Sequence, residues 1–155
     1  MCHRRHAVNS RRWPGHSRPH LLGESGKCMG TTAGAMTNGT PVVISTCVDH
    51  PDQTWYLGYC WGEDCEIRNS ADHSKCLGVA GASADKGTKL VVFSCDGTPN
   101  QKWHSEVKWM GLYRGICNEA HALWVSVAGG GTTNGSSVVQ WPWEGDSDQL
   151  WSFVS

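Results

Sequence analysis

A three-residue motif, Gln-x-Trp, occurs three times at one fixed spacing and limits most strongly how this chain can fold. The motif ends at Trp55, Trp103 and Trp151, so successive copies lie 48 residues apart. A period of this length is typical of one supersecondary unit that is repeated and then stacked or arranged around an axis. The 155 residues have room for three such units in one domain with a proper core.

Cysteines keep the same 48-residue register as the motif. The matching places hold cysteines in the first two copies and tryptophans in the third: Cys28 and Cys47, Cys76 and Cys95, Trp124 and Trp143. Two disulfides at equivalent places are therefore predicted, with an aromatic pair in the third copy. Each copy also carries a glycine at one turn position, Gly39, Gly87 or Gly135, which tolerates the positive φ of a tight turn.

The remaining cysteines give a mixed signal. Four residues, turn formers among them, separate Cys60 from Cys65, and a disulfide across such a hairpin is sterically reasonable if the two cysteines face each other. Nothing in the spacing decides whether Cys2 and Cys117 are free or paired. Eight cysteines favour an oxidising compartment, so a secreted protein is expected. The first residues lack the apolar core of a signal peptide, so either the start is misassigned or the chain is part of a longer protein.

Composition narrows the class of protein. Nineteen glycines and only 17% charged residues are typical of many short strands and turns. The net charge of −1 gives no general attraction to nucleic acid, and no apolar run is long enough to span a membrane. Residues 1–18 are predicted to be a disordered basic tail. Cys2, His3 and His6 lack a second ligand pair at zinc-finger spacing, so no metal or cofactor is expected.

Strand parity separates a core face from an outer face, because side chains alternate across a strand. Predicted core positions are apolar in every copy, apart from Thr31 and Gln140: Met29, Thr31, Val42 and Ile44; Leu77, Val79, Leu90 and Val92; Val125, Val127, Val138 and Gln140. Phe93 and Trp141 fall on the outer face. There an aromatic ring either packs under a loop or stacks on the C–H face of a sugar. The final strand, Leu150–Val154, is expected to pair near Leu21 and Leu22 and close the fold.

The three Gln-x-Trp endings with matching cysteine pairs resemble the ricin B-type lectins and related xylan- or galactose-binding modules. The resemblance covers residues 19–155 and implies an all-β fold, the β-trefoil, with three four-stranded repeats around a pseudo-threefold axis. The repeats would span about 19–66, 67–114 and 115–155. Copy two, which contains Cys76 and ends in Asn100-Gln101-Lys-Trp103, is the most similar.

The resemblance also implies where a sugar would bind. The implied carbohydrate-binding residues are Phe93, Asn100 and Gln101 in copy two, and Trp141, Asp148, Gln149 and the substitute donor Ser126 in copy three. This sequence departs from the family at the aspartate two residues after the first cysteine, where it has Gly30, Gly78 and Ser126. Copy one also has Ser45 in place of the aromatic residue, so the sites are partly degenerate.

The expected function is a lectin-like module that binds galactose- or xylan-type glycans or glycoproteins. It would act without nucleic acid or a membrane, and it could be tethered to the catalytic domain of a glycoside hydrolase. The alternative is a trefoil scaffold that has lost sugar binding and serves protein–protein interaction or structure. An enzyme is not expected, because no nucleophile elbow, phosphate-binding loop or metal-ligand spacing occurs. The neighbouring acids Glu63 and Asp64 are explained by solvation in a turn.

Overall fold

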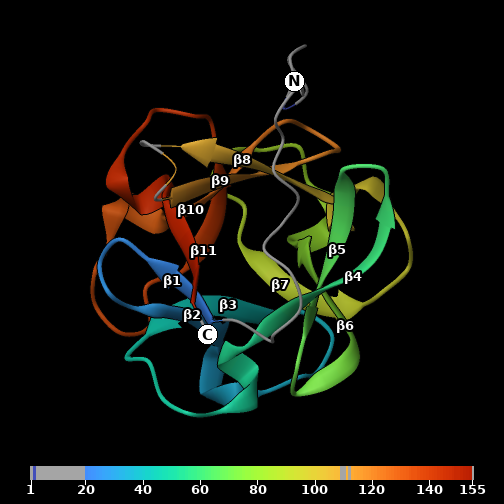
Figure 1. Ribbon diagram of the computed structural model, residues 1–155. Coiled ribbons are helices and arrows are strands. Elements are labelled where there is room, and N and C mark those ends of the chain that lie inside the picture. The colour runs from blue at the N-terminus through green and yellow to red at the C-terminus, as the bar shows by residue number, and fades with distance from the viewer. Residues whose placement is uncertain (1, 3–19, 109–110, 112, 155) are drawn as a thin grey trace.

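The computed structural model describes Cys2 and residues 20–108, 111 and 113–154, and the described residues fold as an all-β chain (Figure 1). They form twelve strands: β1 (His20–Gly23), β2 (Cys28–Thr31), β3 (Thr40–Ser45), β4 (Trp55–Trp61), β5 (Asp64–Asn69), β6 (Asp72–Val79), β7 (Leu90–Ser94), β8 (Trp103–Lys108), β9 (Tyr113–Asn118), β10 (Trp124–Val127), β11 (Val138–Trp141) and β12 (Trp151–Val154). Short 3₁₀ helices connect them: η1 (Thr32–Gly34), η2 (Pro51–Gln53), η3 (Ala80–Ala82), η4 (Pro99–Gln101), η6 (Ala128–Gly130) and η7 (Ser147–Gln149). In this part of the chain no helix has the length and hydropathy needed to pass through a bilayer.

Six strands close into a barrel. β1 pairs with β12, β12 with β9, β9 with β8, β8 with β5 and β5 with β4, always antiparallel. A bridge between His20 and Thr54 returns from the start of β4 to β1. Leu21 pairs with Phe153 and Leu22 with Ser152, as the sequence predicted for the closing strand. Closure pairs strands that would otherwise present unpaired backbone groups at an edge.

The other six strands form three hairpins, β2–β3, β6–β7 and β10–β11, which contact one another; Figure 1 shows β3 beside β7. Gly39, Gly87 and Gly135 have φ between +85° and +88°, the region that the predicted turns require. Their N–H groups donate to carbonyl oxygens of the next copy, Val92, Gln140 and Ile44, at 2.7–2.8 Å. Each turn therefore docks on its neighbour, and the third docks back on the first.

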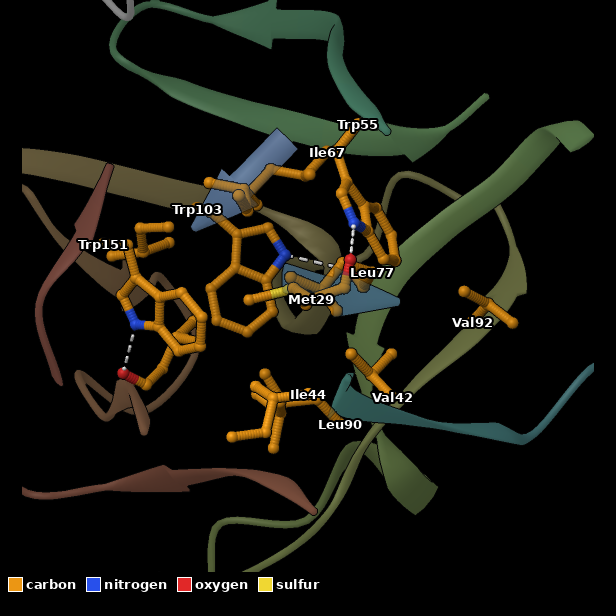
Figure 2. Close-up of a cluster of buried hydrophobic side chains, with 14 of the residues drawn as sticks. Met29, Val42, Ile44, Trp55, Ile67, Leu77, Leu90, Val92, Trp103 and Trp151 are labelled. Carbon is orange, nitrogen blue, oxygen red and sulfur yellow. Dashed lines mark hydrogen bonds between the residues drawn. The ribbon is translucent and has the colours of Figure 1, made fainter. Parts of the chain in front are cut away.

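The core is built around the three motif tryptophans (Figure 2). Each indole is fully buried, and its N–H donates to a strand carbonyl oxygen 26 residues earlier in the chain. The pairs are Trp55 with Met29, Trp103 with Leu77 and Trp151 with Val125, at 2.9, 2.9 and 3.0 Å. Burial and hydrogen bonding are thus satisfied together, and the threefold β-trefoil predicted from the motif is confirmed.

Gln140, the polar exception in the predicted core set, is fully buried as its parity required. Its side-chain N–H donates to the carbonyl oxygens of Ser83 and Asp85 at 2.9 and 2.8 Å. Both acceptors lie in the loop after η3 of the second copy. The amide therefore ties two copies together at a place where the equivalent residues, Ile44 and Val92, are apolar.

All eight cysteines lie among the described residues, and they form four disulfides: Cys28–Cys47, Cys60–Cys65, Cys76–Cys95 and Cys2–Cys117. The first three confirm the predicted pairs, and the fourth answers the question that the sequence left open. Apart from Cys2, the predicted basic tail of residues 1–18 lies outside the described residues. The predicted repeat boundaries near 66 and 114 fall inside β5 and β9, and they remain predictions.

The third copy replaces its disulfide with the predicted aromatic pair. The ring centroids of Trp124 and Trp143 are 4.8 Å apart with a tilt of 53°, and the ammonium of Lys108 lies 4.5 Å from the Trp143 centroid. A Cβ at Gly115 would come within 2.7 Å of the Trp124 ring, so only glycine leaves room for this packing. An aromatic pair contributes about 0.5–1.5 kcal/mol to stability, and a disulfide that closes a loop of this length contributes about 3 kcal/mol. The contact at this place therefore stabilises copy three less than the disulfides stabilise copies one and two.

We predict that Trp103→Phe lowers the free energy of unfolding by about 2–4 kcal/mol, because it leaves the Leu77 carbonyl without its buried donor and opens a cavity. Chemical denaturation measures the change. Val107→Ala, which truncates an exposed side chain on the same strand, should change stability by about 0.5 kcal/mol or less. Equal stability of Trp103→Phe and the wild type would show that the indole hydrogen bond does not support the fold.

Candidate functional site

Two hollows occupy equivalent places on copies two and three. They have volumes of about 300 Å³ and 360 Å³, and most of their lining residues correspond one to one at a spacing of 48. Each is bounded by a short 3₁₀ helix, by the second strand of the copy's hairpin and by the loop before Gln-x-Trp. Gly39 lines the copy-two hollow and Gly87 lines the copy-three hollow, so the turn of the preceding copy adds a wall to each.

An aromatic ring forms one wall of each hollow. Phe93, at the end of β7, is 44% exposed, and Trp141 ends β11 at the matching place. Trp141 contacts copy two: a Cβ on Gly87 would lie 3.4 Å from its ring, and the Lys86 ammonium lies 5.0 Å from its centroid. The Trp141 ring is therefore supported by residues of another copy. The 48-residue register relates equivalent positions and could not predict this contact between copies.

The residue before the motif glutamine fastens the loop wall to the strand behind it. One side-chain oxygen of Asp148 accepts from the Val127 backbone N–H at 3.1 Å, and Asn100 accepts from Val79 at 3.3 Å. The Asn100 amide in turn donates to the Thr98 hydroxyl at 2.7 Å. Both residues line their hollows, so each can meet a ligand while it holds the loop.

The motif glutamines are buried beneath the loops. Gln101 accepts from the Asp96 N–H at 2.9 Å and donates to the Ser94 carbonyl at 3.0 Å. Gln149 repeats this arrangement, accepting from Glu144 at 2.8 Å and donating to Pro142 at 2.8 Å. The amides therefore shape the loops from below, and direct sugar contact through them would compete with these bonds.

Ser126 is also buried, and it is not among the residues that line the copy-three hollow. Its hydroxyl donates to the Trp124 carbonyl oxygen at 3.0 Å and accepts from the Gln149 amide at 3.0 Å. The structure thus places Ser126 as an anchor for Gln149.

The glycines at the matching place explain the missing aspartate of the family. A Cβ on Gly78 would lie 3.1 Å from the Asn100 side-chain oxygen, and one on Gly30 would lie 2.8 Å from an Asp52 oxygen. A larger side chain at either place would require the Asn100 or Asp52 side chain to shift. The departure from the family pattern is therefore matched by tighter packing between strand and loop.

Charge distinguishes the two hollows. Glu144, Asp146 and Asp148 all line the copy-three hollow, whereas Asp96 is the acidic residue that lines the copy-two hollow. Burial raises the pKa of Asp148; hydrogen bonds from backbone N–H groups oppose the rise, and the neighbouring charges of Asp146 and Glu144 add to it. The copy-three hollow therefore combines several hydrogen-bond acceptors with the aromatic ring of Trp141.

Copy one has the carboxylate of the site but lacks its aromatic residue. Asp52 accepts from the Thr31 N–H at 3.0 Å, as its equivalents do. The His50 imidazole contacts the same carboxylate, and a Cβ on Gly34 would meet the His50 ring at 3.3 Å. With Ser45 in place of the aromatic residue, this copy offers an imidazole–carboxylate pair but no stacking wall from β3.

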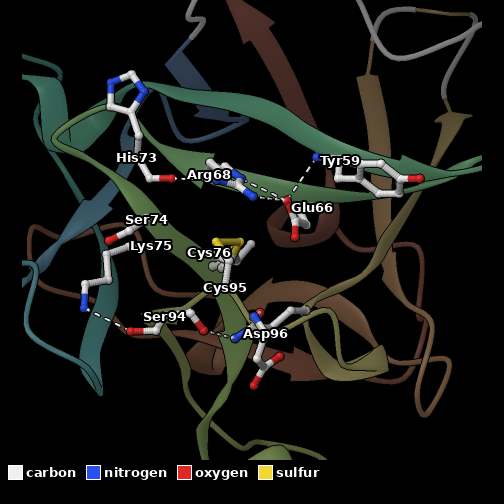
Figure 3. Close-up of a disulfide and its surroundings, with 12 residues drawn as sticks. Tyr59, Glu66, Arg68, His73, Ser74, Lys75, Cys76, Ser94, Cys95 and Asp96 are labelled. Atoms are coloured by element: carbon white, nitrogen blue, oxygen red, sulfur yellow. Dashed lines mark hydrogen bonds and ion pairs between the residues drawn. A yellow bond between two sulfur atoms is a disulfide. The ribbon is translucent and has the colours of Figure 1, made fainter.

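A cluster of possible metal ligands on copy two is explained without a metal. Glu66, Cys76 and Cys95 bring ligand atoms within 4.8 Å of one another. Both sulfur atoms belong to the Cys76–Cys95 disulfide and are not thiolates (Figure 3). The Glu66 carboxylate accepts from Arg68 at 2.8 Å and from the Tyr59 N–H at 3.0 Å. This donor set does not suit a metal ion.

The sequence profile of the ricin-type beta-trefoil lectin domain matches residues 20–151, so the chain belongs to this family. No match was found among curated protein sequences. The family is one of lectin domains, and such domains are typically non-catalytic.

Solved structures show the same fold. The designed threefold-symmetric protein ThreeFoil is 22% identical over 88% of this chain and 97% of its own, with a TM-score of 0.84. An exo-beta-1,3-galactanase from Clostridium thermocellum is 26% identical over 91% of this chain but only 30% of its own length, with a TM-score of 0.85. A ricin B-like lectin from Macrolepiota procera, solved with lactose, is 20% identical over 92% and 99%, with a TM-score of 0.74. The family match supports a carbohydrate-binding module, and the solved structures show the same fold.

We predict that Asp148→Asn raises the melting temperature at pH 7. The gain should be only about 1–2 °C, because solvent screens the charge of a half-buried carboxylate. A raised folded-state pKa means that the ionised side chain disfavours folding. Asparagine can still accept from Val127, as Asn100 does from Val79. The gain should shrink as the pH falls through the raised pKa and vanish below the ordinary value of 3.8, where both states are protonated.

The reciprocal variant Asn100→Asp is the matched control, and it should lower the melting temperature at pH 7. Thermal melts at pH 7 and pH 3 measure both variants. A stabilisation by Asp148→Asn that stays the same at the two pH values would contradict the electrostatic explanation.

Proposed function

We propose that this domain binds a sugar of galactose- or xylan-type glycans in the copy-three hollow. The observation that carries the proposal is the Trp141 ring standing in the same hollow as the acceptor oxygens of Asp148. A pyranose presents apolar C–H groups on its faces and hydroxyl donors at its edge, so a ring and a carboxylate in one hollow match both. Trp141 would stack on the sugar and Asp148 would accept from a hydroxyl.

The other implied residues take supporting roles in this proposal. Gln149 holds the loop that carries Asp148, and Ser126 holds Gln149 through the bond between its hydroxyl and the amide. In copy two, Phe93 and Asn100 would form a second and weaker site, with Gln101 holding its loop. Asn100 is neutral, and a hydrogen bond to a charged acceptor is worth about 1.5–3 kcal/mol, more than a neutral one.

Weak single sites fit a module that acts beside a partner domain. A millimolar site supplies about 4 kcal/mol, so losing the family aspartate leaves little affinity in reserve. Tethering to a catalytic domain or to a second site would raise the effective concentration. We propose a secreted module whose partners are glycans or glycoproteins and which is tethered to a glycoside hydrolase domain. The four disulfides support the extracellular setting, and the galactanase that resembles this chain over part of its length supports the tether.

We predict that Trp141→Ala weakens binding of galactose- or xylose-containing oligosaccharides at least about tenfold, because it removes the stacking wall. Glycan arrays followed by calorimetry measure the change. Phe93→Ala, the equivalent truncation in copy two, should leave the copy-three site intact and remove only a weaker second site. Binding that is unaffected by Trp141→Ala would exclude copy three as the main site.

A trefoil scaffold without sugar binding is the second candidate. It is favoured by Gly30 and Gly78, which stand in place of the family aspartate and lie close to the side chains of the loop. Such a domain would act in protein–protein interaction or as a structural unit. Absence of binding to every glycan on an array, by a wild-type domain with intact disulfides, would decide for this candidate.

A further inference from the structure

Two aromatic rings on the β4–β5 hairpin lie outside the hollows and face solvent. Tyr59 is 62% exposed and Trp61 is 39% exposed, and their ring centroids are 4.6 Å apart in an edge-to-face arrangement. In Figure 3 the Tyr59 ring points away from the Cys76–Cys95 disulfide. Neither ring belongs to the core cluster, so packing of the fold does not account for them.

The hairpin holds these rings in a fixed arrangement. Cys60 lies between them, and its disulfide to Cys65 ties the two strands together at a paired position. A register shift between Leu57 and Cys60 re-aims the side chains that follow. The Tyr59 N–H donates to Glu66, which Arg68 holds in turn. A ligand that stacks here therefore orders few groups when it binds.

Trp61 lies against the loop that forms the wall of the copy-two hollow. A Cβ on Gly97 would come within 3.8 Å of its ring, and the preceding residue, Asp96, lines the hollow. The Lys102 ammonium, from inside the copy-two Gln-x-Trp motif, lies 4.0 Å from the Trp61 centroid and fixes the ring. The loop with Asp96 and Gly97 therefore both lines the copy-two hollow and contacts Trp61.

We propose that Trp61 and Tyr59 extend the copy-two hollow into a site for a glycan chain of several residues. One sugar would occupy the hollow against Phe93, and the following sugars would cross Asp96 and Gly97 to stack on Trp61 and Tyr59. The Lys102 ammonium would donate to a hydroxyl or carboxylate of the chain. This inference rests on the proposed function of the hollows, and it assigns copy two to internal stretches of a polysaccharide.

The test compares chain lengths by calorimetry, with xylose, xylotetraose, galactose and β-1,3-galactotetraose as probes. In the Trp141→Ala background, where copy three no longer contributes, we expect the tetrasaccharide of the preferred series to bind about tenfold more tightly than its monosaccharide. Trp61→Ala and Tyr59→Ala should each remove about threefold to tenfold of this gain and leave monosaccharide binding unchanged. Tyr59→Phe keeps the ring and should keep the gain.

Val107→Ala is the matched control, because Val107 lies 48 residues after Tyr59 on the equivalent hairpin and is 41% exposed. It should leave the binding of every probe unchanged. Phe93→Ala should abolish both the monosaccharide and the tetrasaccharide signals of copy two.

The outcomes separate this inference from the proposed function. Binding that depends on Phe93 or Trp141, with a tetrasaccharide gain that Trp61→Ala and Tyr59→Ala leave intact, overturns the extended site alone. A tetrasaccharide that binds no better than its monosaccharide does the same. No binding of any probe to the wild type overturns both.

Discussion

Three buried indole N–H groups hold this fold together, and each donates to a backbone carbonyl oxygen on the first hairpin strand of its own copy. A buried donor without a partner is costly, so each tryptophan fixes how the barrel strand that it begins lies against that hairpin strand. The glutamine two residues earlier then fixes the loop beside it. Barrel, hairpins and loop walls are therefore positioned by one short motif that is repeated three times.

The groups that build the frame also build the hollows. Asp148 and Asn100 line the hollows and at the same time accept from strand N–H groups, while Gln149 and Gln101 hold the loops from beneath. Trp141 and Phe93, in contrast, contribute stacking surface without such a bond. The aromatic walls can therefore change without loss of the fold, as Ser45 in copy one illustrates. The polar residues, in contrast, both shape the hollows and hold the fold, so they are less free to change.

Much of the fold could be predicted from the sequence, because period and parity act locally. The 48-residue register predicted the buried tryptophans, the turn glycines and the Trp124–Trp143 pair. The site was less predictable, because its decisive contacts cross between copies or use side chains outside the motif. Lys86 against Trp141 and His50 against Asp52 are of this kind, and the Cys2–Cys117 disulfide joins residues 115 positions apart. The hydrogen bond between Ser126 and Gln149 could not be predicted either, because it requires that two buried side chains lie close together.

The turn glycines carry a consequence for how such a pocket arises. Gly39 belongs to copy one but walls the hollow of copy two, and Gly87 does the same for copy three. An excised repeat, even if it folded, would lack the glycine turn that the preceding copy adds to its hollow, so each complete hollow depends on the arrangement of neighbouring copies. Each hollow is thus completed at the junction between neighbouring copies, where Asn38 and its counterpart Lys86 directly precede the two glycines.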